Sequence, residues 1–198
     1  MNRSDLKELY YITPIANVPS ILKHGILSHN LSREIPHDDS MAMSDIQGRR
    51  ENKKIPGTNK QLHDYANLYF DAHNPMLCKR SNRNTKICVL RINASVLDLP
   101  DVIVADRNAS SDYVRFYETV EGLAAIDKEK LFAKYWTHPQ NRYEEWAHKS
   151  IKCAEVLVPN KVEPKYILGA LVANQTALES LKKLERELHV DIKGDIFF

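Results

Sequence analysis

The sequence predicts an α+β fold built on a mixed or antiparallel sheet. Short runs of β-branched and aromatic residues recur along the 198 residues, and helices do not separate them in the regular alternation that a parallel sheet needs. Hydrophobic residues make up 43% of the chain. Because a chain of this length hides roughly 70% of its unfolded surface on folding, one core and a single domain over residues 1–198 are expected.

The N-terminal part is expected to hold one strand, one helix and a long loop. Residues 9–13 have the composition of a strand. Asn17 is the expected N-cap of a short helix that stops at Gly25. Residues 28–60 are mostly polar and are expected to form a long loop with a short helix before Arg49. Loops of that length inside a compact domain are usually functional or disordered.

The rest of the chain mixes strands and helices irregularly. Further strands are expected at residues 68–70, 86–92, 102–105, 153–158 and 166–173. Helices are expected over residues 127–135 and after the N-cap Asn174, where leucines recur at helical spacing at positions 178, 181, 184 and 188. Residues 191–198 are expected to form a terminal strand.

Charge is distributed unevenly along the chain. The formal net charge is +2, but residues 49–91 hold ten basic and three acidic residues, a net of +7, which leaves −5 elsewhere. Local potential steers encounter more than net charge does, so this window predicts a polyphosphate or nucleic-acid partner. The alternative is a solvated face or loop, which is what charge runs usually are.

Several classes of protein are excluded or disfavoured. No apolar run approaches the roughly 20 residues of a membrane span, and the first residues lack the apolar stretch of a signal peptide. The three cysteines are an odd number without a CxxC pair, which argues against a disulfide framework. We therefore expect a cytoplasmic protein that has no membrane partner.

Common cofactor and metal motifs are absent from the sequence. There is no P-loop, no GxGxxG and no GxSxG pattern, and the histidines and cysteines lack the paired spacing of zinc ligands. No metal is therefore expected. Asp98, Asp101 and Asp106 are loosely grouped, which leaves a weak signal for a metal-dependent nuclease.

Glu155 is an acidic residue in a segment whose other residues are apolar. It lies inside the apolar strand expected at residues 153–158, where a carboxylate is costly unless it has a partner or a role. Cys153 and Leu157 share its side of the strand and are apolar, so that side is not obviously solvated. An outward-facing residue and a functional one both remain open.

Ordered blocks of the sequence resemble the DarT family of DNA ADP-ribosyltransferase toxins. The blocks are residues 10–17, 20–22 with Gly25, 46–50, 62–65, 68–70, 74–77, 106–107, 115–116, 135–136 and 153–158, with Phe197 and Phe198 as an aromatic ending. They occur in the family's order across nearly the whole chain. Each block alone is a weak signal, whereas the ordered set is fairly specific.

The resemblance implies an ADP-ribosyltransferase fold related to poly(ADP-ribose) polymerases, with a central split sheet, mixed or antiparallel, and flanking helices. It also implies that NAD is the co-substrate and that ADP-ribose is transferred to thymine or guanine in single-stranded DNA. A macrodomain antitoxin of the DarG type is the implied protein partner. A transferase of the same fold acting on RNA or protein, and a non-enzymatic nucleic-acid-binding module, are the alternatives.

The resemblance also assigns residues. It places the catalytic glutamate at Glu155 and the second arginine of a catalytic pair at Arg50. Its NAD contacts are implied at Tyr11, Ile12, Thr13, Ser20, Leu27 and Tyr69. Tyr11 stands where the family usually has a histidine, and Asn67 and His73 also depart from the family pattern, so the target base stays open.

The nucleic-acid contacts are predicted from charge, aromatic residues and position. Residues 137–152 occupy the substrate-recognition loop position of this superfamily, directly before Glu155. Tyr143 and Trp146 in that segment are expected to stack on bases, whereas Trp136 is expected to pack in the core. The basic residues expected to meet DNA are Arg49, Lys79, Arg80, Arg83 and Arg115.

Overall fold

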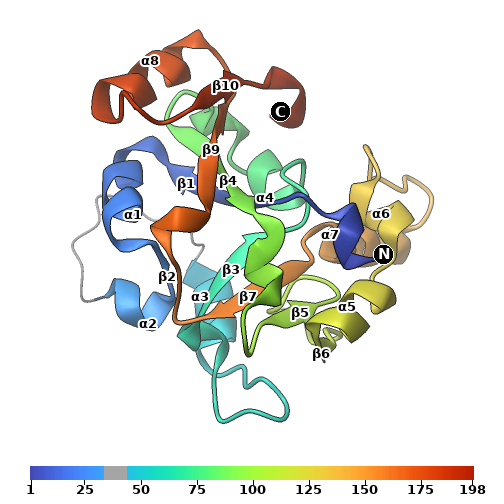
Figure 1. Ribbon diagram of the computed structural model, residues 1–198. Helices are drawn as coiled ribbons and strands as arrows, with labels where there is room; N and C mark the ends of the chain where they lie inside the picture. The colour runs from blue at the N-terminus through green and yellow to red at the C-terminus, as the bar shows by residue number, and fades with distance from the viewer. Residues whose placement is uncertain (34–43) are drawn as a thin grey trace.

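An eight-stranded sheet forms the centre of the computed structural model, which describes residues 1–33 and 44–198 (Figure 1). The strand order is β10-β9-β4-β1-β3-β7-β5-β6, and of these neighbouring pairs only β10 and β9 run parallel. The expected α+β fold with a mixed sheet is confirmed. Its strands are β1 (Glu8–Pro14), β3 (Tyr65–Tyr69), β4 (Ile87–Asn93), β5 (Ile103–Ala105), β6 (Phe116–Glu118), β7 (Glu155–Pro159), β9 (Ile167–Val172) and β10 (Val190–Ile192).

Helices flank the sheet on several sides, and a small second sheet pairs β2 (Ile26–Leu27) with β8 (Lys161–Val162). The α-helices are α1 (Val18–His24), α2 (His29–Ser32), α3 (Ser44–Glu51), α4 (Pro75–Cys78), α5 (Thr119–Ala125), α6 (Lys128–Phe132), α7 (Arg142–Lys152) and α8 (Gln175–Leu184). Short 3₁₀ turns occur at Arg3–Asp5, Ile15–Asn17, Leu62–Asp64, Ser81–Arg83, Ala94–Asp98, Pro164–Tyr166 and Gly194–Ile196. No helix in the described parts of the chain is long and apolar enough to cross a membrane.

The two faces of the sheet carry different clusters of buried side chains. Along β1, Leu9 belongs to the main core, whereas Ile12 belongs to a smaller cluster on the other face. Along β7, Val156 packs into the main core, and Leu157 faces a third cluster. This alternation follows from the period of two along a strand. Glu155 therefore lies on the face of the smaller clusters.

The sheet splits between β1 and β3. β1 pairs with β4 along its whole length, from Glu8 to Pro14, but with β3 only through Tyr10 and Tyr69. Beyond that pair the two strands diverge, so the edge of β1 at residues 11–13 is not matched by a ladder to β3. The split sheet implied by the family resemblance is therefore present in the fold.

The segment expected as a substrate-recognition loop, residues 137–152, is mostly helical. α7 begins after Asn141, whose side chain accepts a hydrogen bond from the Glu144 backbone N–H. Glutamates in its first turn and lysines in its last turn favour a helix, because they complement the helix dipole. The asparagine cap followed three residues later by glutamate is the sequence signal for this helix. The expectation of a loop was wrong for residues 142–152.

Other boundaries also differ from expectation. α3 runs through Arg49 and Arg50 instead of ending before them, and β3 begins three residues earlier than expected, at Tyr65. α8 starts after Asn174 as expected but ends at Leu184, so position 188 lies outside it. The terminal strand is limited to Val190–Ile192, because a 3₁₀ turn follows at Gly194–Ile196. β2, β6, β8 and α5 were not anticipated.

Candidate active site

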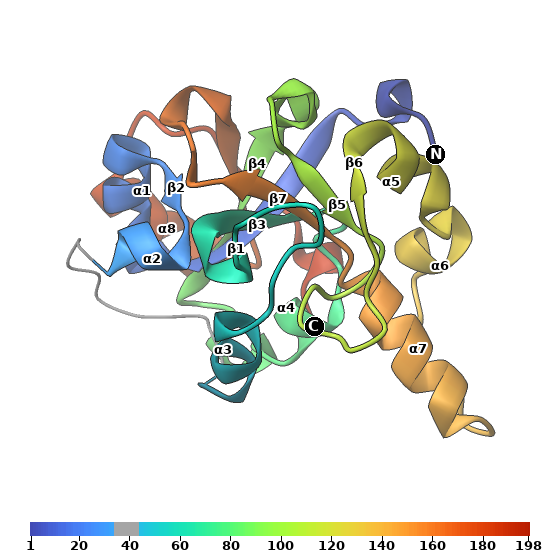
Figure 2. The ribbon, with the colours of Figure 1, turned by 90° about the horizontal axis from the view of Figure 1, so that it is seen from below.

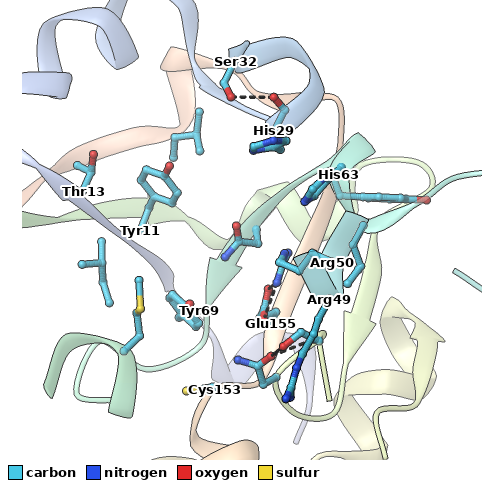
Figure 3. A pocket seen from close by; sticks show the side chains of 18 of the residues that line it. Tyr11, Thr13, His29, Ser32, Arg49, Arg50, His63, Tyr69, Cys153 and Glu155 are labelled. Atoms are coloured by element: carbon cyan, nitrogen blue, oxygen red, sulfur yellow. Dashed lines mark hydrogen bonds and ion pairs between the residues drawn. The ribbon is translucent and has the colours of Figure 1, made fainter. Parts of the chain in front are cut away.

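A cavity of about 670 Å³ opens where β1 and β3 separate. Its wall is built by residues of β1, α1, β2, α2, α3, β3, α4, α7 and β7, together with the loop at residues 108–113. Elements far apart in sequence therefore meet around one space. Figure 3 shows Tyr11 and Thr13 on one side of the site, and His29 and His63 near Arg50 on another.

Glu155 and Arg50 form a buried ion pair in this wall. The Glu155 side chain is 0% exposed, and the Arg50 side chain is 9% exposed. Arg50 Nη1 donates to both carboxylate oxygens, at 3.2 Å to Oε1 and 3.0 Å to Oε2 (Figure 3). The outward-facing alternative for Glu155 was wrong, because this carboxylate is buried and has a charged partner.

Three strands and one loop fix the position of Glu155. It is the first residue of β7, and its backbone lies opposite Tyr69 of β3 on one side and Ala105 of β5 on the other. The Ala109 backbone N–H also donates to Oε1 at 3.0 Å. A central strand position with neighbours on both sides holds a side chain more precisely than a loop does.

The loop at residues 106–113 is ordered by its own polar side chains. Asn108 Oδ1 accepts hydrogen bonds from the Ser110 backbone N–H at 2.9 Å and from its hydroxyl at 2.6 Å. The Asn108 N–H donates to the Ser150 carbonyl at 2.8 Å, which ties the loop to α7. Asp106 pairs with the neighbouring Arg107 at 3.1 Å. The Ala109 N–H is thereby aimed at Glu155.

Burial raises the pKa of three tyrosines that line the cavity, Tyr11, Tyr65 and Tyr69, of which Tyr11 and Tyr69 are predicted NAD contacts. The pKa of Tyr11 rises because its ring is desolvated. The pKa of Tyr69 lies well above its usual value because of burial and then because of the negative charge of Glu155. Both hydroxyls therefore stay neutral at physiological pH. Neutral phenol rings can stack on a ligand and still donate one hydrogen bond each.

A histidine pair lines the opposite part of the cavity. The rings of His29 and His63 have their centroids 4.1 Å apart. Burial lowers the pKa of His63, and the positive charges of His29 and Arg50 lower it further. Because cations dominate the surroundings of this ring, this end of the cavity favours anionic ligand groups.

The cavity brings together all of the residues predicted to act on NAD. Both predicted catalytic residues and all six predicted NAD contacts lie in its wall: Glu155, Arg50, Tyr11, Ile12, Thr13, Ser20, Leu27 and Tyr69. Arg49 and Lys79, predicted for DNA, also line it. Their proximity agrees with a common site, while their individual roles stay predictions.

The other predicted DNA contacts lie outside the cavity wall. They are Arg80, Arg83, Arg115, Tyr143 and Trp146. Tyr143 is 81% exposed and Trp146 55% exposed on α7, which extends away from the sheet (Figure 2). The Arg142 guanidinium lies 5.5 Å from the Trp146 ring centre. Trp136 is buried, as expected for core packing.

The basic window at residues 49–91 does not form one charged face. Arg50 is paired with Glu155 inside the site, and Arg91 is paired with Glu8 and Asp191 at the sheet. Lys53 Nζ donates to the Ser111 carbonyl at 2.8 Å. Lys79 lines the cavity, and Arg83 lies in the 3₁₀ turn Ser81–Arg83 that follows shortly after it in the chain. Some of the basic residues in this window therefore make contacts within the protein.

Some cavity residues were missed by the sequence reasoning. They are mainly His29, His63, Asn67, Met76, Lys149 and the loop at residues 108–113. The Asp106-Arg107 block followed by small polar residues was the available signal for the loop. Within the described part of the chain, no group of three or more His, Cys, Asp or Glu side chains is arranged to hold a metal ion.

Comparison with known proteins places this chain in a family. The family model of DarT, described as an ssDNA thymidine ADP-ribosyltransferase, matches residues 10–198. A DNA ADP-ribosyl transferase of Thermus sp. is 34% identical, over 90% of this chain and 87% of its own length. A transferase–glycohydrolase fusion protein of Thermosipho africanus is 31% identical over 97% of this chain. The chain spans 49% of the length of that fusion protein.

Solved structures agree with this assignment. Thermus sp. 2.9 DarT in complex with ADP-ribosylated ssDNA has a TM-score of 0.81 at 28% identity and covers 100% of this chain and 99% of its own. The same protein in complex with NAD+ gives a TM-score of 0.75 at 27% identity and covers 97% of this chain and 98% of its own. The fold is thus that of an ADP-ribosyltransferase. Within that class, the chain belongs to the DarT family.

Proposed function

We propose that this chain is an NAD-dependent mono-ADP-ribosyltransferase that modifies a base in single-stranded DNA and releases nicotinamide. The observation that carries the proposal is the buried Glu155–Arg50 pair in the wall of a cavity at the split of the sheet. Thymine is the base that the family description names. Guanine is the alternative that the sequence leaves open.

In this proposal NAD binds in the cavity along β1 and α1. The unpaired edge of β1 at residues 11–13 presents backbone groups that can bond the amide or ribose next to nicotinamide. Tyr69 supplies an aromatic face for the nicotinamide ring. Ser20 and Leu27 line the continuation of the cavity. The cationic surroundings of His63 suit the pyrophosphate.

Glu155 has the properties that nicotinamide departure requires. Loss of nicotinamide leaves an oxocarbenium-like ribose, whose positive charge a fixed carboxylate stabilises. The carboxylate can also accept a hydrogen bond from the 2′-hydroxyl and so orient the sugar. Both Glu155 oxygens are already held by Arg50 and one by Ala109, so the group does not need to reorganise in the transition state.

Arg50 is proposed to meet the target base as well as Glu155. Arg50 bonds the carboxylate through Nη1, and we propose that Nη2–H and Nε–H serve a second ligand group. These groups can stabilise negative charge that develops on the attacking base. Arginine does not act as a proton acceptor, since it stays charged. Binding of the pyrophosphate is its competing role.

We also propose the biological setting of the reaction. The Thermosipho relative joins a transferase to a DNA ADP-ribosyl glycohydrolase in one chain. This supports a toxin whose mark is reversed by a partner glycohydrolase, the DarG-like macrodomain antitoxin. The proposed domain is residues 1–198, and the proposed location is the cytoplasm, where both NAD and DNA are available.

The proposed function is tested by incubating the protein with NAD and single-stranded oligonucleotides of each base composition. We expect nicotinamide release together with an ADP-ribose adduct on one base, identified by mass spectrometry of the nucleosides. Modification of RNA or of protein instead of DNA would favour a same-fold transferase with another acceptor. A protein that binds DNA but never releases nicotinamide would be a binding module.

The exposed Trp146 of α7 and the basic residues that follow α4 predict how DNA is held. Trp146→Ala should weaken binding of single-stranded DNA by about 1–3 kcal/mol, because one stacked base is lost.

A combined Lys79→Ala, Arg80→Ala and Arg83→Ala variant should flatten the dependence of log affinity on log salt, because fewer counterions are released. Fluorescence anisotropy at several salt concentrations measures both effects. Lys183→Ala on α8, an exposed lysine away from the cavity, is the matched control, and an equal effect there would refute the assigned surface.

A further inference from the structure

Lys152 is a fully buried lysine close to the proposed catalytic residues. It is the last residue of α7, and its side chain is 0% exposed. Its ammonium group pairs with Asp71 and also donates to the Ala133 carbonyl at 3.0 Å. It lies 5.8 Å from the centre of the Trp136 ring. A lysine is almost never fully buried unless it is paired, so this position calls for an explanation.

The Lys152–Asp71 ion pair lies just beyond the end of the β3–β7 ladder, whose last register pair joins the site residues Tyr69 and Glu155. Tyr69 ends β3, Glu155 begins β7, and the two face each other as the final register pair. Asp71 follows Tyr69 by two residues, and Lys152 precedes Glu155 by three. Among the described residues, the β3–β7 pairing ends at Tyr69 and Glu155. A ladder end frays unless another contact closes it.

The Lys152 side chain is shielded from water, whereas Asp71 is 20% exposed, and neighbouring groups fix the direction of the pair. Asp71 Oδ1 accepts a hydrogen bond from the His73 backbone N–H at 3.0 Å, while Oδ2 receives Lys152. On the other side, Trp136 packs with His73 at 5.6 Å and with Phe198 at 5.5 Å between ring centroids. A directional pair with one partner fully buried holds its two chain segments in one relative position more strictly than an exposed pair does.

From this placement we infer that Lys152 is a positioning residue. Through Asp71 it sets the separation of Glu155 and Tyr69 at the open end of the β3–β7 ladder, and it joins α7 to that end. The inference rests on the proposed function, because it gives Lys152 a role in placing the carboxylate and the aromatic face that act on NAD. Lys152 itself does not touch the reacting atoms.

The test compares Lys152→Met, Asp71→Asn and the double variant with the unaltered protein. Lys152→Met should lower kcat for nicotinamide release by roughly 10- to 100-fold, since a displacement near 1 Å at the reacting groups has an effect of this size. KM for NAD should stay within about threefold, because the residues of β1 and α1 that line the cavity are not moved. Lys128→Met is the matched control, since it removes a lysine from an exposed pair with Asp5 at 3.7 Å. Its kcat should not change.

The double variant distinguishes an effect on the placement of the site residues, measured by kcat, from an effect on the stability of the fold, measured by Tm. Removing one partner leaves the other buried charge unpaired and should lower Tm, whereas removing both charges should bring Tm back toward that of the unaltered protein. We expect the double variant to regain Tm but not kcat. Recovery of kcat together with Tm, or a rise in KM with kcat unchanged in Lys152→Met, would overturn the inference. An unaltered protein that releases no nicotinamide would instead refute the proposed function.

Discussion

Glu155→Gln should abolish nicotinamide release and DNA modification while leaving a folded protein. Glutamine has nearly the same shape as glutamate but lacks the negative charge that faces the developing ribose cation. Loss of a preorganised electrostatic contact at such a centre lowers kcat by about 10²- to 10³-fold or more. Release of radiolabelled nicotinamide and mass spectrometry of the oligonucleotide measure the two half-reactions separately.

Glutamine is the appropriate replacement because of the partners of Glu155. Its amide oxygen can still accept from Arg50 or from the Ala109 N–H, so the buried arginine keeps a hydrogen bond. Alanine would leave Arg50 without that contact and so confuse lost chemistry with lost stability. Thermal unfolding of Glu155→Gln checks that the fold persists. An active, folded Glu155→Gln variant would remove Glu155 from the mechanism.

The fold could be predicted from the sequence wherever local pattern and tertiary structure agree. The strands at β1, β4 and β9 are rich in apolar and β-branched residues, and the helix after Asn174 has both a cap and periodic leucines. Glu155 stood out because a carboxylate inside an apolar strand conflicts with burial. Such a conflict marks a residue that needs a partner.

The partner itself could not be read from the sequence. Arg50 lies 105 positions before Glu155, in a polar stretch where an arginine usually faces solvent. Only tertiary packing brings them together, because α3, which carries Arg50, packs against the turn at Leu62–Asp64 that leads into β3, the neighbour of β7. Lys152 was missed for the same reason, because lysine at a helix C-terminus normally complements the helix dipole at the surface. Contacts between segments that are far apart in the sequence leave no recognisable pattern in the residues around either partner.

The split of the sheet illustrates a second limit. The compositions of β1 and β3 predict strands, but nothing in either strand says that their ladder stops at Tyr10 and Tyr69. The cavity exists because the strands then diverge, and its far walls come from α2, α3 and the loop at residues 108–113. The residues contributed by the split itself, at β1 and Tyr69, were expected only through resemblance to the family. The loop and the histidine pair had no such support.

Arg50→Lys should separate the two roles proposed for the arginine. A lysine ammonium can still pair with Glu155, but it is a point charge and cannot serve the carboxylate and a second group with a planar fork. We therefore expect nicotinamide release in the absence of DNA to persist at a reduced rate. Transfer to DNA should fall further, by roughly tenfold or more relative to nicotinamide release, because the contact to the attacking base is lost. The ratio of modified oligonucleotide to released nicotinamide is the quantity to measure.

The competing role of Arg50 gives a different kinetic pattern. If its main contact is the pyrophosphate, Arg50→Lys should raise KM for NAD and leave the ratio of transfer to release unchanged. Arg50→Met supplies the control for stability, since it leaves the fully buried Glu155 without its charged partner and should lower the free energy of unfolding by about 3–5 kcal/mol. Adding Glu155→Gln to Arg50→Met should restore much of that stability without restoring activity. That result would mean that the pair is maintained for chemistry, because a buried ion pair whose removal scarcely changes the folding free energy has no structural reason to persist.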